Sequence, residues 1–423
     1  MDHHPSLSSP CLPTEICDYI LDHLWDDHET LKVCSRVTRE WLPTTRKHLF
    51  SFVFIINLRV VTFAEMIMHS GDALAFCVRQ LFLVWYLGQR GINPVPKPTF
   101  VPRMLASLGR LEKLTLRVYM LDNCSSSAET ITWPILPVVK TLRLRIDIVN
   151  DVVRLQRFIC ACPSLSSLKL WITQTSKCDS SHTHPTMVIS RSIVIETFQY
   201  HVCESDPILR WLLQGGLKLR IRRLAIIVPD LTPTPTAVNF FRTGDAQALL
   251  RACGECLEHL IVEWPETISP GSPDGQQASA LAHNPNLVSI YVSSVWCGFS
   301  VNDGWLGLFS VLADIEPMHT KLQSIDITLV AAFKPDSTIS LCEQLDAALA
   351  RIADTHPRLI FTIWITCNLR IPAPWLAEFV KVLLQGLVRV QAGPGRLCLM
   401  WLNGYDEIRE LGHRTKPSWY WQW

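Results

Sequence analysis

A six-residue pattern, apolar-x-x-apolar-x-apolar, returns about ten times along this chain. The copies lie about 26 to 38 residues apart, and those at Val139 and Leu359 depart from the pattern by one residue. Apolar and other residues alternate in the second half of each copy, which indicates a strand with one buried face. The copies begin at Val78, Leu111, Val139, Leu165, Ile195, Ile221, Leu257, Leu287, Leu322 and Leu359.

Segments with helical spacing separate several of these strands. Short signals such as "CPSL" at Cys162 and "HPRL" at His356 end a helix and lead into the next strand. Strands joined by helical crossovers run parallel, and a strand-plus-helix unit buries its apolar face only by stacking on its neighbours. The sequence therefore predicts an α/β solenoid, with a doubly wound α/β enzyme as the rival interpretation. The expected helices are Val152–Cys162, Ala246–Leu257, Trp305–Ile315 and Leu341–Asp354.

The repeats resemble the leucine-rich-repeat family over about residues 75 to 403. This resemblance implies a curved parallel sheet with helices on its convex side, which we assign to residues 51–410. The Asn or Cys that the family carries after each strand is mostly missing, and the spacing lengthens towards the C-terminus, so we expect an irregular solenoid. The leucines expected to be buried in one continuous stack are Leu114, Leu142, Leu168, Leu224 and Leu260.

The stretch "LPTEICDYILDHL" near the N-terminus predicts an amphipathic helix. Four apolar residues spaced four apart form one stripe along it, and Pro13 suits the first turn. Thr30 is expected to cap a second helix that continues as far as Trp41. Two or three short helices contain too little core to cover such a stripe alone, so either the repeats or a partner must cover it. The stripe consists of Leu12, Ile16, Ile20 and Leu24.

The same segment resembles the F-box motif. The matching residues are Leu12, Pro13, Glu15, Ile16, Ile20, Leu24, Leu31, Cys34, Val37, Trp41, Arg46, Leu49 and Phe50. The chain departs from the motif at Thr38 and Arg39, where the family usually carries Cys or Arg, and in a longer connector between the helices. The resemblance implies a short all-helical F-box over residues 11–50. We expect residues 1–10, which precede it, to be disordered.

An F-box implies a partner, because members of that family bind a Skp-type adaptor and through it a cullin–RING ubiquitin ligase. The residues expected to contact the adaptor are Leu12, Pro13, Ile16, Ile20, Leu24, Leu31, Val37 and Trp41. In the alternative interpretation, the N-terminal helices only cap the solenoid, as repeat proteins require.

Basic residues gather at the strand positions that alternate with the buried ones. These side chains are expected on the concave face of the sheet, where Arg forks suit an acidic or phosphorylated segment of a target protein. The competing interpretation is an ordinary solvated strand face. The candidate target-binding residues are Lys113, Arg117, Lys140, Arg143, Arg145, Lys169 and Trp171.

Composition limits the other possible functions. The formal net charge is +1, which gives no general attraction to nucleic acid or to a membrane surface. The start "MDHHPSLSSP" lacks the features of a signal peptide, and the apolar run "FSFVFIINL" is too short to span a membrane. Fifteen scattered cysteines suggest free thiols and a cytoplasmic or nuclear location.

Metal and catalytic motifs are weak or missing. Cys253-x-x-Cys256 stands alone, without a second pair at zinc-site spacing, and is better explained as core thiols. Cys178, His182 and His184 lie in a polar stretch without a fourth ligand. The chain contains no G-x-S-x-G, no phosphate-binding loop with Lys and Ser/Thr, and no H-E-x-x-H. We therefore expect neither an enzyme nor a cofactor.

The expected function is that of a substrate-recognition subunit of an SCF-type ubiquitin ligase, with an unknown protein as its target. The alternative is a ubiquitin-independent repeat module for protein binding. The Trp-rich tail at 411–423, which ends "SWYWQW", is expected to plug the end of the last repeat.

Overall fold

The structure is a computed structural model, and it describes residues 12–56, 59–69, 72–87, 100–120, 133–149, 152–175, 193–201, 207–214, 218–227, 245–263, 281–297, 303–331, 338–367 and 373–402. The chain divides into two compact units, Met1–Ser166 and Ser167–Trp423, which we call unit 1 and unit 2. The expectations for residues 1–10 and 411–423 lie outside the described residues.

Three short helices open unit 1: α1 (Thr14–His23), α2 (His28–Val37) and α3 (Leu42–Leu49). Pro13 is the N-cap of α1, and its fixed φ of −55° suits that position. The prediction that Thr30 caps the second helix is wrong. The cap is Asp27, whose carboxylate accepts a hydrogen bond from the Thr30 backbone N–H at 3.0 Å. The second helix also ends before Trp41, because Thr38 adopts an extended conformation.

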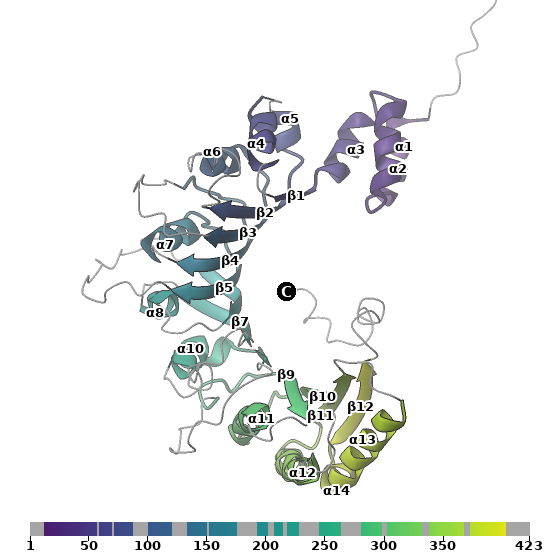
Figure 1. The fold of residues 1–423 in the computed structure, drawn as a ribbon, viewed down its shortest axis with the longest axis vertical. Helices are drawn as coiled ribbons and strands as arrows, with labels where there is room; N and C mark the ends of the chain where they lie inside the picture. Colours follow the sequence, from purple (N-terminus) through teal and green to yellow (C-terminus); the bar gives the residue numbers. More distant parts are fainter. Residues whose placement is uncertain are drawn as a thin grey trace, which may run out of the picture. The chain divides into compact units, whose positions relative to one another are not determined.

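The rest of unit 1 is a parallel sheet with helices on one face. Its strands pair in sequence order, and Figure 1 shows α6 and α7 along the same side of β2–β4. The strands are β1 (Phe52–Ile56), β2 (Gln80–Leu87), β3 (Lys113–Met120) and β4 (Thr141–Val149). The helices are α4 (Arg59–His69), α5 (Asp72–Ala75), α6 (Phe100–Ser107) and α7 (Val152–Cys160).

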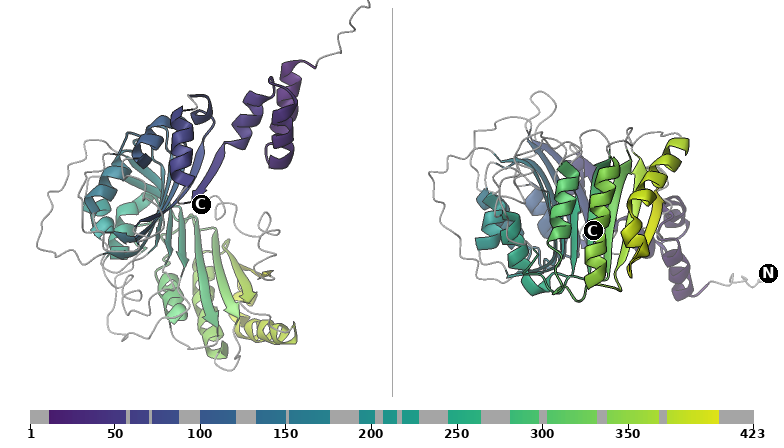
Figure 2. Two further views of the ribbon diagram at one scale, coloured as in Figure 1. Left: turned by 45° about the horizontal axis from the view of Figure 1, so that its top comes forward. Right: turned by 90° about the horizontal axis from the view of Figure 1, so that it is seen from below.

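Unit 2 repeats the same arrangement. Its strands are also parallel and paired in sequence order, and Figure 2 shows α11, α12 and α13 on one face of the last strands. The strands are β5 (Ser167–Thr175), β6 (Val194–His201), β7 (Lys218–Ile227), β8 (His259–Glu263), β9 (Ser289–Cys297), β10 (Ser324–Ala331), β11 (Ile360–Cys367) and β12 (Arg396–Leu402). The helices are α8 (Pro207–Gln214), α10 (Asp245–Cys253), the 3₁₀ turn η1 (Gly254–Cys256), α11 (Asp303–Ala313), α12 (Thr338–Thr355), α13 (Ala373–Gly386) and α14 (Val388–Ala392).

This architecture confirms the predicted fold class, an α/β repeat protein with a helical N-terminal segment and an open parallel sheet. A doubly wound fold is excluded, since such folds place helices on both faces and reverse the strand order at a switch point. Each predicted hexad lies at one of the strands β2–β11. The five leucines expected in the core are at most 1% exposed: Leu114, Leu142, Leu168, Leu224 and Leu260.

The expected helices need one clear correction. The predicted span Ala246–Leu257 stops being α-helical at Cys253, because Gly254 adopts a left-handed φ of 52° and starts a 3₁₀ turn. β1 and β12 were not predicted as strands. No helix among the described residues is long and apolar enough to span a membrane.

Polar side chains tie successive repeats of unit 2 to one another. The amide of Asn284, which is fully buried, donates to the carbonyls of Leu250 and Gly254 in the preceding repeat, both at 2.9 Å. The Arg351 guanidinium likewise donates to Leu312 and Ile315 carbonyls, at 2.7 and 3.1 Å. Carbonyls at the ends of helices are satisfied in this way by the next repeat along the chain.

Candidate protein-interaction surfaces

The helical segment carries a set of large apolar side chains that are exposed. Among the residues predicted to bind an adaptor, Leu12 is 57% exposed, Ile16 and Ile20 are each 47%, and Val37 is 58%. Pro13 is also exposed, whereas Leu24 and Trp41 are partly buried. Leu31 is fully buried, so it supports the segment from within. The sequence prediction missed three further exposed residues: Tyr19 at 65%, Trp25 at 63% and Val33 at 64%.

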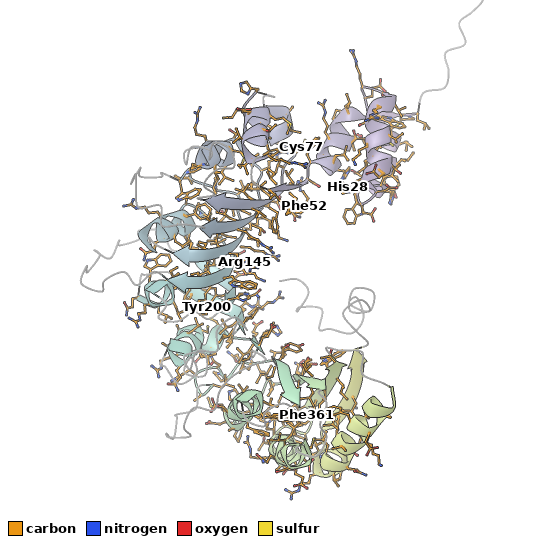
Figure 3. The ribbon with its side chains drawn as sticks, viewed as in Figure 1. His28, Phe52, Cys77, Arg145, Tyr200 and Phe361 are labelled. Atoms are coloured by element: carbon orange, nitrogen blue, oxygen red, sulfur yellow. The ribbon has the colours of Figure 1, made fainter. Side chains whose placement is uncertain are left out.

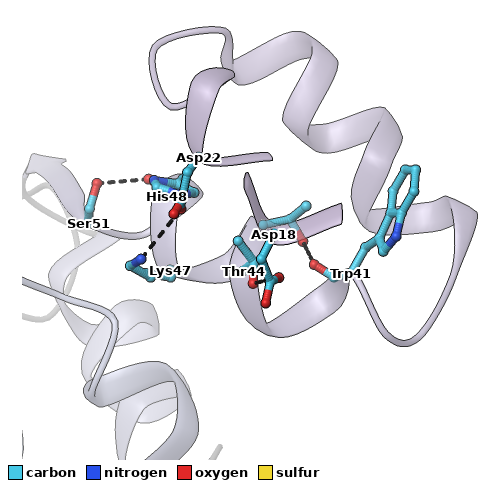
Figure 4. Close-up of polar contacts among 8 residues, drawn as sticks. Asp18, Asp22, Trp41, Thr44, Lys47, His48 and Ser51 are labelled. Atoms are coloured by element: carbon cyan, nitrogen blue, oxygen red, sulfur yellow. Dashed lines mark hydrogen bonds and ion pairs between the residues drawn. The ribbon is translucent and has the colours of Figure 1, made fainter. Parts of the chain in front are cut away.

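Polar contacts between α1 and α3 hold this surface in place (Figure 4). The Thr44 hydroxyl donates to the Asp18 carboxylate. The Asp22 carboxylate lies 2.6 Å from His48 Nε2 and 3.5 Å from Lys47 Nζ. The hydrogen bond from His48 lowers the pKa of Asp22 below its usual value. Because Asp22 is half exposed, this pair orients the helices more than it stabilises them.

A second surface covers the strands of unit 1 on the face opposite α6 and α7. We call it the open face of unit 1. Register places its side chains in three rows across β1–β4: Phe52–Gln80–Lys113–Thr141, Phe54–Phe82–Thr115–Arg143 and Ile56–Val84–Arg117–Arg145. Each row begins with an apolar residue on β1, and cationic residues lie on β3 or β4. Phe52 and Arg145 point to the same side of the ribbon in Figure 3.

The cations of the open face are crowded and partly buried. Burial lowers the pKa of Lys113, and the nearby Arg143 lowers it further. Burial also lowers the pKa of Arg143. The Arg117 guanidinium stacks over the Phe82 ring, 4.9 Å from its centroid, which is a cation–π arrangement. Four of the predicted target-binding residues thus share one surface: Lys113, Arg117, Arg143 and Arg145.

The other predicted target-binding residues lie elsewhere. Lys140 is exposed and precedes β4. Lys169 and Trp171 belong to β5 of unit 2, where the Trp171 ring stacks on His201 at 4.2 Å.

The apolar margin of the open face was not predicted. Phe52, Phe54 and Ile56 are 50%, 53% and 43% exposed, and the Phe54 ring lies 4.9 Å from that of Phe82. The continuous apolar run around β1 was the available signal, but such a run does not show which residues face solvent.

The corresponding face of unit 2 is more buried and polar. Tyr291, at 2% exposure, shares a hydrogen bond of 2.8 Å with the Thr328 hydroxyl, and burial raises the Tyr291 pKa to about 12. Asp326 is 5% exposed and accepts a hydrogen bond from Trp364 Nε1 at 3.3 Å. Burial raises the pKa of the Asp326 carboxyl. These groups form hydrogen bonds within a packed sheet face.

The sequence did not predict a metal site, and the Cys253-x-x-Cys256 pair was interpreted as core thiols. Cys253 is buried, and burial raises the pKa of its thiol, but Cys256 is exposed, so that interpretation is wrong for Cys256. Cys178, His182 and His184 lie outside the described residues. Across the part of the chain that the structure describes, no three His, Cys, Asp or Glu side chains group as metal ligands.

Fold and surfaces together define an α/β repeat protein with an N-terminal helical segment. No model of a known protein family matches the chain, and no curated protein matches it. Among solved structures it is similar to a chain in the yeast complex of Rad7 and Elc1, with 14% sequence identity over 86% of this chain and 87% of that one. The TM-score is 0.33, too low to transfer a function.

Proposed function

We propose that this protein is a substrate-recognition subunit of an SCF-type ubiquitin ligase. Its helical segment would bind a Skp-type adaptor, and its repeats would bind a protein target. The proposal rests on the F-box-like pattern of residues 12–50 together with the exposed side chains of that segment.

The observation that carries the proposal is the exposure of Leu12, just before α1, and of Ile16 and Ile20 along it, each at 47% or more. Large apolar side chains that gather on one surface mark an interaction site. The helices already bury Leu21 and Leu31 as their own core. The stripe on α1 therefore remains available to a partner.

The experiment measures binding of purified full-length chain to a Skp-type adaptor by calorimetry. Removing a well-buried interface side chain commonly costs about 2 kcal/mol or more, and about 1.4 kcal/mol is tenfold in affinity. Pro13→Ala combined with Ile16→Ala should therefore weaken binding by about a hundredfold. Val388→Ala, which changes a 60% exposed side chain of α14, is the matched control and should have no effect. Absence of binding by the unmodified chain would refute the proposal.

A further inference from the structure

Aromatic and cationic side chains form a continuous ladder across the open face of unit 1. Phe54 on β1 packs on Phe82 of β2, and the Arg117 guanidinium of β3 lies over the Phe82 ring. A ring on one face of an Arg leaves its N–H edge available for a planar acceptor. The ladder thus orients a cation beside an exposed apolar margin.

Three cations of this face lie away from the described carboxylates. Among the described residues, no Asp or Glu lies within ion-pair distance of Lys113, Arg117 or Arg143, and Arg143 disfavours the charge of Lys113. Partly buried charges without a counter-ion carry a desolvation penalty that is not repaid. A bound anionic group would remove that penalty.

The apolar margin supplies the other half of a binding surface. Phe52, Phe54 and Ile56 project from one side of a strand that pairs only with β2 among the described strands. Three exposed large side chains in a row are uncommon on a solvated strand, which ordinarily carries polar residues there. Contact with apolar side chains of a partner would remove this surface from water.

The distance between the two halves sets the spacing in the partner. Neighbouring strands lie about 4.8 Å apart, so β1 and β4 are about 14 Å apart, and an extended chain spans this with about four residues. We propose that the open face of unit 1 binds an extended protein segment that crosses the strands, with a large apolar residue at Phe54 on β1 and an acidic residue about four positions away at Arg143 on β4, within reach of Arg117 on β3. The inference rests on the proposed receptor function and names its class of target.

A carboxylate fits better than the alternatives. The free edge of Arg117 and the side chain of Arg143 offer planar forks that match a carboxylate. A strand added to the edge of β1 would reach the apolar row but would lie about 14 Å from Arg117, too far to use the cations.

The test uses the full-length chain and fluorescent synthetic peptides that carry one Phe and one Glu, with the number of residues between them varied. Affinity should peak when Glu follows or precedes Phe by about four positions. Arg117→Glu with Arg143→Glu should weaken the best peptide by about thirtyfold or more. Arg103→Glu, the same change on the exposed surface of α6, is the control and should bind like the unmodified chain.

Three results would overturn the inference. The first is a peptide affinity that does not change with the spacing between Phe and Glu. The others are binding only when a phosphoserine replaces Glu, and self-association of the chain that Phe54→Ser abolishes. Hydrogen exchange is measured on the unmodified chain, so a folding defect in a variant cannot affect the result. Protection that the peptide induces outside β1–β4 would also contradict the inference. Adaptor binding is measured on the same preparations. Adaptor binding without peptide binding rejects this inference alone, and the reverse rejects the proposed ligase function alone.

Discussion

At the scale of single residues, Gly386 shows how closely two helices of unit 2 approach. It ends α13, and a methyl group added to it would overlap the Cβ atom of Cys342 on α12. Cβ atoms cannot rotate away from each other, so relief requires the backbone to move. The close approach is therefore what requires glycine here.

Gly386→Ala should lower the free energy of unfolding by about 1 to 3 kcal/mol, because overpacking outweighs the better helix propensity of alanine. Thermal or denaturant unfolding measures this. Gly109→Ala is the matched control, since its new Cβ would sit 4.0 Å from the Phe76 ring, an ordinary contact. Cys342→Gly should couple with Gly386→Ala, so that the double variant loses less stability than the sum. Strict additivity would contradict the overlap.

Asp326 gives a prediction about pH. Because burial raises its pKa in the folded protein, the folded state holds the proton more tightly than the unfolded state does. The tighter binding of this proton by Asp326 stabilises the folded state below the pKa of Asp in the unfolded chain, about 4. This stabilisation is lost as the pH rises through the pKa of Asp326 in the folded state. Asp326→Asn keeps an oxygen for Trp364 Nε1 and should raise the melting temperature at pH 7.5, with a gain that shrinks as the pH falls towards 4.

The control for loss of one charge is Asp354→Asn, an exposed carboxylate on α12. It should leave the pH dependence of the melting temperature close to that of the unmodified chain. A gain from Asp326→Asn that grows on acidification would have the wrong sign and would reject this account.

Single residues also show where sequence reasoning stops. Helical spacing identified Ile16 and Ile20 as one face of α1, and that face is exposed. The same spacing could not tell that Leu31 is buried while Val33 is exposed, because packing among the three helices decides which side of α2 is covered. The pairing of Phe54 with Phe82 depends on strand register, which single residues do not encode.

At the scale of elements, the buried Asn284 connects its repeat by hydrogen bonds to the C-terminal end of α10 and to η1 in the preceding repeat. Its amide donates to the carbonyls of Leu250 in α10 and Gly254 in η1. Water has little access to this position, since the side chain is fully buried.

Asn284→Ala should therefore destabilise unit 2 by about 2 kcal/mol, because it removes two hydrogen bonds from a buried side chain. The matched control is Asn286→Ala. That side chain also donates to a carbonyl, of Glu255 at 2.7 Å, but in an exposed position where water replaces it. The control should change the free energy of unfolding by less than about 0.5 kcal/mol. Equal losses for both variants, measured by denaturant unfolding, would contradict a role for burial.

Strands were predicted correctly from the sequence where apolar residues on the buried face alternate with other residues on the opposite face. Strands β2–β11 follow the hexad because their apolar residues alternate with others. β1 reads "FVFII" and has no alternation, although only Ile55 of that strand is buried. The cap of α2 was predicted at the wrong residue, because Asp27 and Thr30 are both good N-cap residues. Only the backbone structure shows that the Asp27 side chain accepts the capping hydrogen bond.

At the scale of the whole molecule, the helical segment and the strands meet at Ser51. Its carbonyl accepts hydrogen bonds from the Arg79 and Gln80 backbone N–H groups at 3.0 and 2.8 Å, which joins the start of β1 to β2. A cut before Ser51 leaves this junction intact.

Deletion of Met1–Phe50 should therefore abolish adaptor binding while shifting the melting temperature of the repeats only slightly. Calorimetry of the truncated chain and adaptor titration measure the two effects. If the helices serve only as a cap, the same deletion should expose repeat core and cause unfolding or aggregation. That outcome, together with no adaptor binding by the full chain, would end the ligase interpretation.

The pairing of each strand with its neighbour in sequence has a consequence for synthesis. A nascent chain that has released β1 and β2 from the ribosome already holds both members of their pair, as Phe52 and Gln80 illustrate. Pairing over short separations along the chain favours fast folding, and chains generally fold from the N-terminal side as they emerge. The sheet can thus form one repeat at a time during translation.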